Sequence, residues 1–186
     1  LWPSESRAAS SEAFDLKAEM QADAETLQLA NLSLAFEQGG TPQILLGEIR
    51  ANWAKALDVD AKLTSRWLDL DRIAGVADGA GPLDSILPFA QRLRELMPAE
   101  GRARASLAIE QANVGRDSAG SVELILLRSG RDLQIDRFRG LLPGAARLDM
   151  RGTLSGTVES PVFVGALDLR GSSLAKFTSW ASSGLL

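Results

Sequence analysis

The chain has 186 residues, and 20 Lys and Arg residues against 24 Asp and Glu residues give it a net charge of −4. Cys, His and Tyr are all absent, which excludes disulfides, thiolate nucleophiles, Cys-ligated zinc and the Ser-His-Asp triad. The acidic balance and the scattered basic residues argue against a nucleic-acid partner, which needs a concentrated basic face.

Apolar and polar residues alternate with a period of two along most of the chain, which predicts strands with one apolar and one polar face. Such one-sided strands are typical of antiparallel sheets. The phase of the alternation slips between Leu29 and Leu32 and predicts a bulge near Ala30 and Asn31. In chain order, the nine predicted strands cover 13–22, 27–36, 45–53, 57–64, 103–114, 121–128, 132–138, 147–154 and 163–170.

Helix signals are few. An apolar stripe with a three-to-four residue spacing predicts the longest helix over Leu83–Met97, capped by Asp84 or Ser85. A short helical turn is expected at Asp69–Ile73, and Ser172 and Ser173 are expected to cap a last helix. The predicted fold is therefore mostly β: an antiparallel meander forming a curled sheet, groove or sandwich, with two or three short helices.

An internal repeat is visible in this pattern. Three apolar positions recur at a constant offset of 104 residues, since Leu63, Leu70 and Ile73 match Leu167, Leu174 and Phe177. In each copy a one-sided strand runs into a polar turn and a short helix. We therefore expect a flexible terminus (1–12), a first β repeat with a helical turn (13–75), a linker with an amphipathic helix (76–102) and a second β repeat with a C-terminal helix (103–186).

The stretch 133–154 reads LQIDRFRGLLPGAARLDMRGTL. It resembles the recurring strand, LPGG, strand, G-x-L pattern of AsmA-like proteins, and the likeness continues through Phe163–Leu169 and on to Trp180. Ala145 stands where a second glycine is usual. A weaker version of the same pattern occupies Leu57–Gly75.

The resemblance implies a function. AsmA-like proteins of Gram-negative envelopes are anchored in the inner membrane, and their β-rich periplasmic body forms an extended groove with proposed roles in phospholipid transport and outer-membrane assembly. We therefore expect a non-enzymatic periplasmic segment, anchored through a region outside this sequence, with phospholipid acyl chains and envelope proteins as partners. The alternative is a periplasmic β-sandwich module that docks a partner protein through an edge strand and carries no lipid.

The candidate groove residues are apolar side chains on the predicted strand faces: Leu34, Phe36, Ile49, Leu148 and Met150. A one-sided sheet must cover its apolar face, so a closed core competes with an open groove, and the sequence favours the closed core for this segment. Trp53, Trp67 and Trp180 fall on apolar phases and are also expected in the core.

No catalytic, cofactor-binding or metal-binding residues are predicted. The pairs Asp58/Asp60 and Asp69/Asp71 bring carboxylates together, but no calcium-loop pattern surrounds them, and Asp69 is expected to cap a helix. The basic run Arg92, Arg94, Arg102 and Arg104 can approach anionic lipid headgroups. Glu95 and Glu100 interleave with it, which favours a solvated face.

Overall fold

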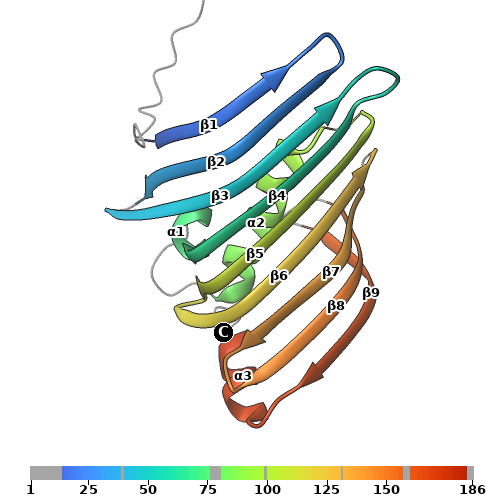
Figure 1. Ribbon diagram of the computed structural model, residues 1–186. Coiled ribbons are helices and arrows are strands. Elements are labelled where there is room, and N and C mark those ends of the chain that lie inside the picture. Colours follow the sequence, from blue (N-terminus) through green and yellow to red (C-terminus); the bar gives the residue numbers. More distant parts are fainter. Residues whose placement is uncertain are drawn as a thin grey trace, which may run out of the picture.

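The computed structural model describes residues 14–38, 40–75, 81–98, 100–130, 132–156 and 160–183. Nine strands form one sheet in chain order (Figure 1), and all nine predicted strands are confirmed. Their bounds are β1 Phe14–Ala22, β2 Thr26–Gln38, β3 Thr41–Asn52, β4 Asp58–Asp69, β5 Arg102–Val114, β6 Asp117–Ser129, β7 Asp132–Leu142, β8 Ala146–Gly156 and β9 Pro161–Arg170. The expected flexible terminus, 1–12, lies outside the described residues.

Neighbouring strands are antiparallel at every step except one. β4 and β5 run parallel, with Asp58 opposite Arg102 and Asp69 opposite Asn113. A parallel pair needs a crossover connection, and here the crossover contains the helices α1 (Leu70–Ala74) and α2 (Pro82–Leu96). The meander predicted from the sequence is thus two antiparallel halves joined by a parallel pair.

The two faces of the sheet differ in chemistry, as the alternation predicts. One row of paired residues, one from each strand, runs Ala22, Leu27, Ala51, Val59, Ala103, Arg128, Leu133, Leu154 and Phe163. The adjacent row points to the other face and runs Gln21, Gln28, Arg50, Asp60, Arg104, Leu127, Gln134, Thr153 and Val164. An apolar face and a largely polar face therefore continue across all nine strands.

The predicted bulge in the second strand is confirmed. The pairing of β2 with β3 shifts between Leu29 and Leu32, and Asn31 has a φ of 51°. Asn tolerates this left-handed conformation better than most residues. The bulge keeps Leu32 and Leu34 on the same apolar face as Leu27 and Leu29.

Three helices accompany the sheet, and α2 is the longest, as predicted. Its expected cap is wrong: the N-cap is Gly81, because Pro82 occupies the first helical position, and the Asp84 carboxylate accepts a hydrogen bond from the Gly81 backbone N–H at 2.7 Å. The Asp69 and Ser173 side chains cap α1 and α3 (Leu174–Ala181), which confirms both predicted caps.

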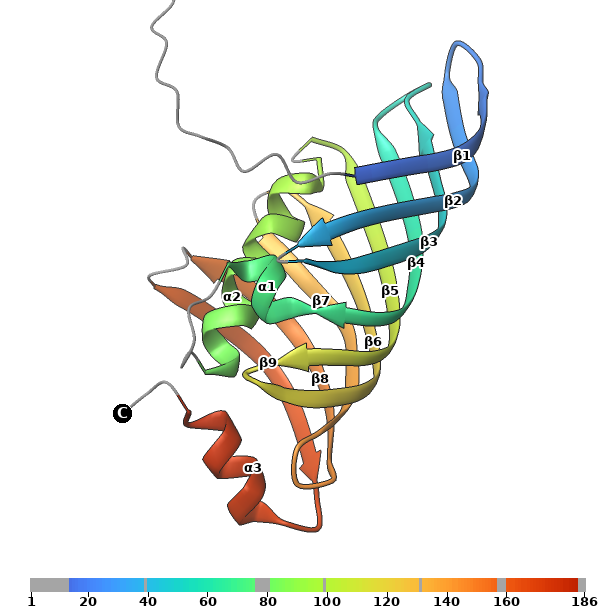
Figure 2. The same cartoon turned by 90° about the vertical axis from the view of Figure 1, so that its left-hand side faces the viewer.

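The sheet is strongly curved, and α1 and α2 lie on its concave side (Figure 2). Two clusters of buried side chains join the helices to the sheet. The first contains Leu68, Ile109, Val114 and Val122 together with Trp180 of α3, and the second joins Met97 to Ala103, Leu126, Leu133 and Ile135. The concave face is therefore the apolar face, and the core lies where helices cover it.

A similar series of elements occurs twice: a run of antiparallel strands that ends in a short capped helix. Four strands, β1–β4, precede the short helix α1, and five strands, β5–β9, precede α3. These two helices begin 104 positions apart, at Leu70 and Leu174. Their caps have the same geometry, since Asp69 accepts from the Arg72 N–H and Ser173 from the Lys176 N–H. The division of the chain into repeats at 75 and 103 stays a prediction, because one sheet runs through both segments.

Candidate functional site

Among the described residues, no group of three or more Asp and Glu side chains could hold a metal ion. The most extensive unusual feature is the concave apolar face, which the helices cover only in part. In Figure 1, α1 and α2 lie behind the middle of the sheet, while β1 lies at its upper edge.

The first strand carries the most exposed part of this face. Phe14, Leu16 and Met20 are 74%, 53% and 69% exposed, although their pairing places them on the apolar face. Met20 pairs with Leu29, which pairs with Ile49. A continuous apolar surface therefore reaches from the open edge of β1 across β2 and β3.

The five candidate groove residues all lie on this concave face, but in two different settings. Phe36 and Leu148 pack against the first buried cluster, and Met150 packs against the second. Leu34 and Ile49 belong to neither cluster and lie in the part of the face that continues to β1. The structure thus places all five on one surface, three beside the helix-covered core and two in the open region.

The closed core favoured by the sequence is wrong for this sheet. β1 and β9 are its two edges and are not paired with each other, so the sheet stays open. The three helices cover only the middle and lower part of the nine strands, as their small number in the sequence indicates (Figure 2). The residues left uncovered, Phe14, Leu16 and Met20, were missed as site residues, although their alternation with Asp15, Lys17 and Glu19 already marked an apolar face.

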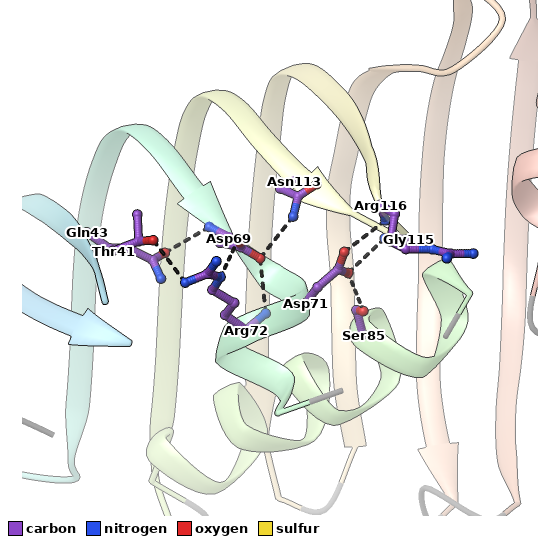
Figure 3. A network of polar contacts seen from close by, with 9 residues as sticks. All are labelled: Thr41, Gln43, Asp69, Asp71, Arg72, Ser85, Asn113, Gly115 and Arg116. Carbon is purple, nitrogen blue, oxygen red and sulfur yellow. Dashed lines mark hydrogen bonds and ion pairs between the residues drawn. The ribbon is translucent and has the colours of Figure 1, made fainter. Parts of the chain in front are cut away.

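The paired carboxylates at the start of α1 hold the fold together. The buried Asp69 side chain accepts hydrogen bonds from the Arg72 N–H at 3.0 Å and from Asn113 Nδ2 at 3.1 Å, and it forms an ion pair with the Arg72 guanidinium (Figure 3). The Asp69 backbone N–H donates to the buried Gln43 side chain at 2.8 Å. The contacts of the Asp69 side chain therefore stabilise the start of α1 and link it to β5.

Asp71 links three elements. Its carboxylate accepts hydrogen bonds from the backbone N–H groups of Gly115 and Arg116, at 2.7 and 2.9 Å, and from Ser85 Oγ of α2 at 2.5 Å (Figure 3). The turn between β5 and β6 is thereby tied to both helices of the crossover. This arrangement positions α2 over the concave face.

The convex face is a solvated surface. Glu48 lies between Lys62 and Arg50, at 3.2 and 3.1 Å, and the hydrogen bond from Lys62 and the charge of Arg50 hold the pKa of the Glu48 carboxyl below its ordinary value. Arg139 and Asp149 form a similar exposed pair at 2.7 Å. A hollow of about 760 Å³ interrupts this face near Ile44, Leu46 and Trp67.

The three tryptophans do not share one environment. Trp180 is buried in the first cluster and donates from its indole nitrogen to the Val114 carbonyl at 3.0 Å, as a core residue should. Trp67 is half-buried beside the convex hollow. The core prediction is wrong for Trp53, which is 43% exposed and donates to the Ala24 carbonyl at 2.8 Å in the loop region beside β3.

In comparisons with family models, curated proteins and solved structures, nothing matches this chain. Within the described ranges, none of the helices is both long and apolar enough to span a bilayer. The concave apolar face is therefore the feature of this structure that bears on function.

Proposed function

We propose that this chain is a non-enzymatic lipid-binding segment that holds phospholipid acyl chains on its concave apolar face. The observation that carries the proposal is the exposure of Phe14, Leu16 and Met20 on the same face as Leu34 and Ile49. An apolar surface of this kind on a soluble domain marks an interaction site. Acyl chains suit it because the surface is aliphatic, elongated and continuous with a packed core.

The sequence resemblance to AsmA-like proteins supports the wider proposal. In this wider proposal, the chain is part of the periplasmic body of an envelope protein that is anchored in the inner membrane. That protein serves phospholipid transport or outer-membrane assembly. The curved open sheet with an apolar inner face has the form that such a role requires. The sheet edges β1 and β9 leave room for the groove to continue.

A second candidate function is protein docking through β9. This edge strand exposes apolar side chains on both of its faces: Phe163 and Leu167 on the concave side and Val162 and Val164 on the convex side. Edge strands of this kind can accept a further strand from a partner. A chain that only docks a partner through β9 binds no lipid, so a measurement of bound lipid distinguishes the two candidate functions.

The test compares two matched substitutions. Met20→Glu places a carboxylate on the concave face at a side chain that is 69% exposed, and Val164→Glu does the same on the convex face at one that is 70% exposed. Neither position is in a buried cluster, so both variants should fold. Photo-crosslinking to phospholipid in cells and native mass spectrometry of the purified chain report lipid contact.

Lipid binding predicts that Met20→Glu loses the crosslinks and the bound lipid, while Val164→Glu keeps both. The acyl-chain proposal is contradicted if both variants keep the crosslinks and the bound lipid. It is also contradicted if the unmodified chain carries no lipid. A stable partner protein that Val164→Glu releases would instead favour docking through β9.

A further inference from the structure

One charged residue lies in an apolar row of the concave face. This row is close to the end of the sheet that carries the β1–β2 and β6–β7 turns. In the row that runs from Ala22 to Phe163, eight strands contribute apolar side chains and β6 contributes Arg128. The side chain is partly buried, so its charge has lost part of its hydration. A partly buried charge beside an apolar surface is costly unless an anion or strong acceptors neutralise it.

The acceptors that Arg128 contacts are all uncharged. Its Nη1 donates to the Met97 carbonyl at 2.6 Å and also to the Arg94 carbonyl, both at the C-terminal end of α2, and its Nε donates to the Gly130 carbonyl at 3.0 Å. These helix-end carbonyls carry only partial negative charge. They accept its hydrogen bonds and compensate its positive charge only in part.

A second guanidinium belongs to the same end of α2. Arg94, on the last turn of α2, donates to the Gly156 carbonyl at 3.0 Å and lies 3.5 Å from the Gln91 side-chain oxygen. Within the described part of the chain, the ion pairs join other side chains, and neither Arg94 nor Arg128 has a carboxylate partner. Two guanidinium groups held by neutral oxygens therefore lie near the C-terminal end of α2, one from the helix itself and one from β6.

We propose that Arg94 and Arg128 form a phosphate-binding site that holds the headgroup of a phospholipid whose acyl chains lie on the concave face. Guanidinium groups bind phosphate through paired, charge-assisted hydrogen bonds that are stronger than bonds to neutral carbonyls. The phosphate replaces the helix-end carbonyls and Gly156 as acceptor. This inference rests on the proposed function and adds to it the requirement for an anionic headgroup.

The site also relates lipid binding to α2. The carbonyls of Arg94 and Met97 belong to the end of the helix that packs Leu93 and Met97 onto the second buried cluster. A phosphate that takes over the Arg128 donors loosens that end of α2, while Asp71 and Ser85 still hold the other end.

The test uses three probes with the full chain. Dihexanoyl phosphatidylglycerol carries a phosphate and short acyl chains, dihexanoylglycerol carries the same chains without phosphate, and inorganic phosphate carries no chains. Calorimetric titration measures the affinity of the chain for each probe. The variants are Arg94→Gln and a matched control, Arg92→Gln, which removes the same charge from the same helix but whose guanidinium donates to the Ile73 carbonyl of α1.

We expect Arg94→Gln to weaken phosphatidylglycerol binding about tenfold, the effect of one lost charge-assisted hydrogen bond. Binding of dihexanoylglycerol should not change, and Arg92→Gln should bind both lipids as the unmodified chain does. Because Arg128 also holds the end of α2, it is tested by the conservative Arg128→Lys, which keeps the charge but loses the paired geometry. That variant should retain its melting temperature and lose affinity for phosphatidylglycerol selectively.

Three results would overturn the inference. If both lipids bind equally and Arg94→Gln changes neither, acyl-chain binding stands and the phosphate site is wrong. If phosphate alone binds as tightly as phosphatidylglycerol, with the same dependence on Arg94, the site takes a free anion and the lipid headgroup is wrong. If neither lipid binds the unmodified chain, the proposed function fails together with the inference.

Discussion

The Asp71 carboxylate lies 2.7 Å from the backbone nitrogen of Gly115, 44 positions away in the chain, and ties the first turn of α1 to the turn between β5 and β6. The same carboxylate accepts hydrogen bonds from the Arg116 backbone N–H and from Ser85 Oγ. We expect Asp71→Ala to lower the free energy of unfolding by about 3 kcal/mol, because two backbone N–H groups lose a charged acceptor. Chemical denaturation measures the loss.

The control for this change is Asp168→Ala, which removes a carboxylate from an exposed ion pair with Arg170. Exposed pairs stabilise proteins by at most about 1 kcal/mol, so Asp168→Ala should be close to neutral. Equal losses in the two variants would show that the contacts of Asp71 contribute no more than a surface charge does.

The two settings of the candidate groove residues predict different costs for the same substitution. Met150 packs against the second buried cluster, whereas Ile49 lies outside both clusters. A carboxylate at Met150 should therefore destabilise the fold by roughly 3 kcal/mol, as burial of an unpaired charge does, and Ile49→Glu should cost clearly less. Thermal melts of both variants decide the question, and a larger loss at Ile49 would place the covered part of the face elsewhere.

The turn between β7 and β8 contains a strained alanine. Ala145 has a φ of 52°, next to Gly144 at 81°. The left-handed conformation costs a residue with a Cβ roughly 1 kcal/mol relative to glycine. We expect Ala145→Gly to raise the midpoint of urea denaturation. Ala108→Gly, at an exposed position inside β5, should lower it, and the prediction is wrong if both changes have the same sign.

The turn between β1 and β2 depends on an ionised carboxylate. Asp23 accepts hydrogen bonds from the backbone N–H groups of Glu25 and Thr26 and from the Thr26 hydroxyl, each at 2.8 Å. These bonds hold the pKa of Asp23 below its ordinary value of 3.8. Because the folded pKa is the lower one, this contribution is present above the ordinary value and is lost as pH falls through the folded value.

Amide hydrogen exchange of β1 and β2 measures this dependence. Protection should weaken as the pH falls below the ordinary pKa of Asp23, and Asp23→Asn should remove that part of the dependence. An Asp23 carboxyl that titrates in NMR at its ordinary pKa would contradict the prediction.

Much of the fold was predictable because alternation reports which face each side chain occupies. The slip between Leu29 and Leu32 predicted the bulge at Asn31, and the caps at Asp69 and Ser173 followed from their hydrogen-bonding side chains. Alternation carries no information about strand direction, so the parallel pairing of β4 and β5 could not be predicted. Gly81 was missed as the cap of α2 because Asp84 and Ser85 are better cap residues by type.

The candidate site was predictable only in part. Sequence places Leu34 and Ile49 on an apolar face, and the pairing confirms that placement. Whether helices cover that face depends on where α2 lies, which is a tertiary property. Arg128 was missed for the same reason, since its position in an apolar row emerges only when nine strands are paired in register.

The parallel pairing of β4 and β5 has a consequence for how fast this chain reaches its native state. The antiparallel pairs join consecutive strands through short turns. The strands within β1–β4 and within β5–β9 can therefore pair through local contacts. Asp58 and Arg102 pair across 44 positions, and that ladder forms only after a long loop has closed. Non-local pairing slows folding, so the two halves should form early and their joining at β4 and β5 should limit the rate. Until the two halves join, the edges of β4 and β5 that face each other in the native sheet are unpaired, and unpaired edges promote aggregation.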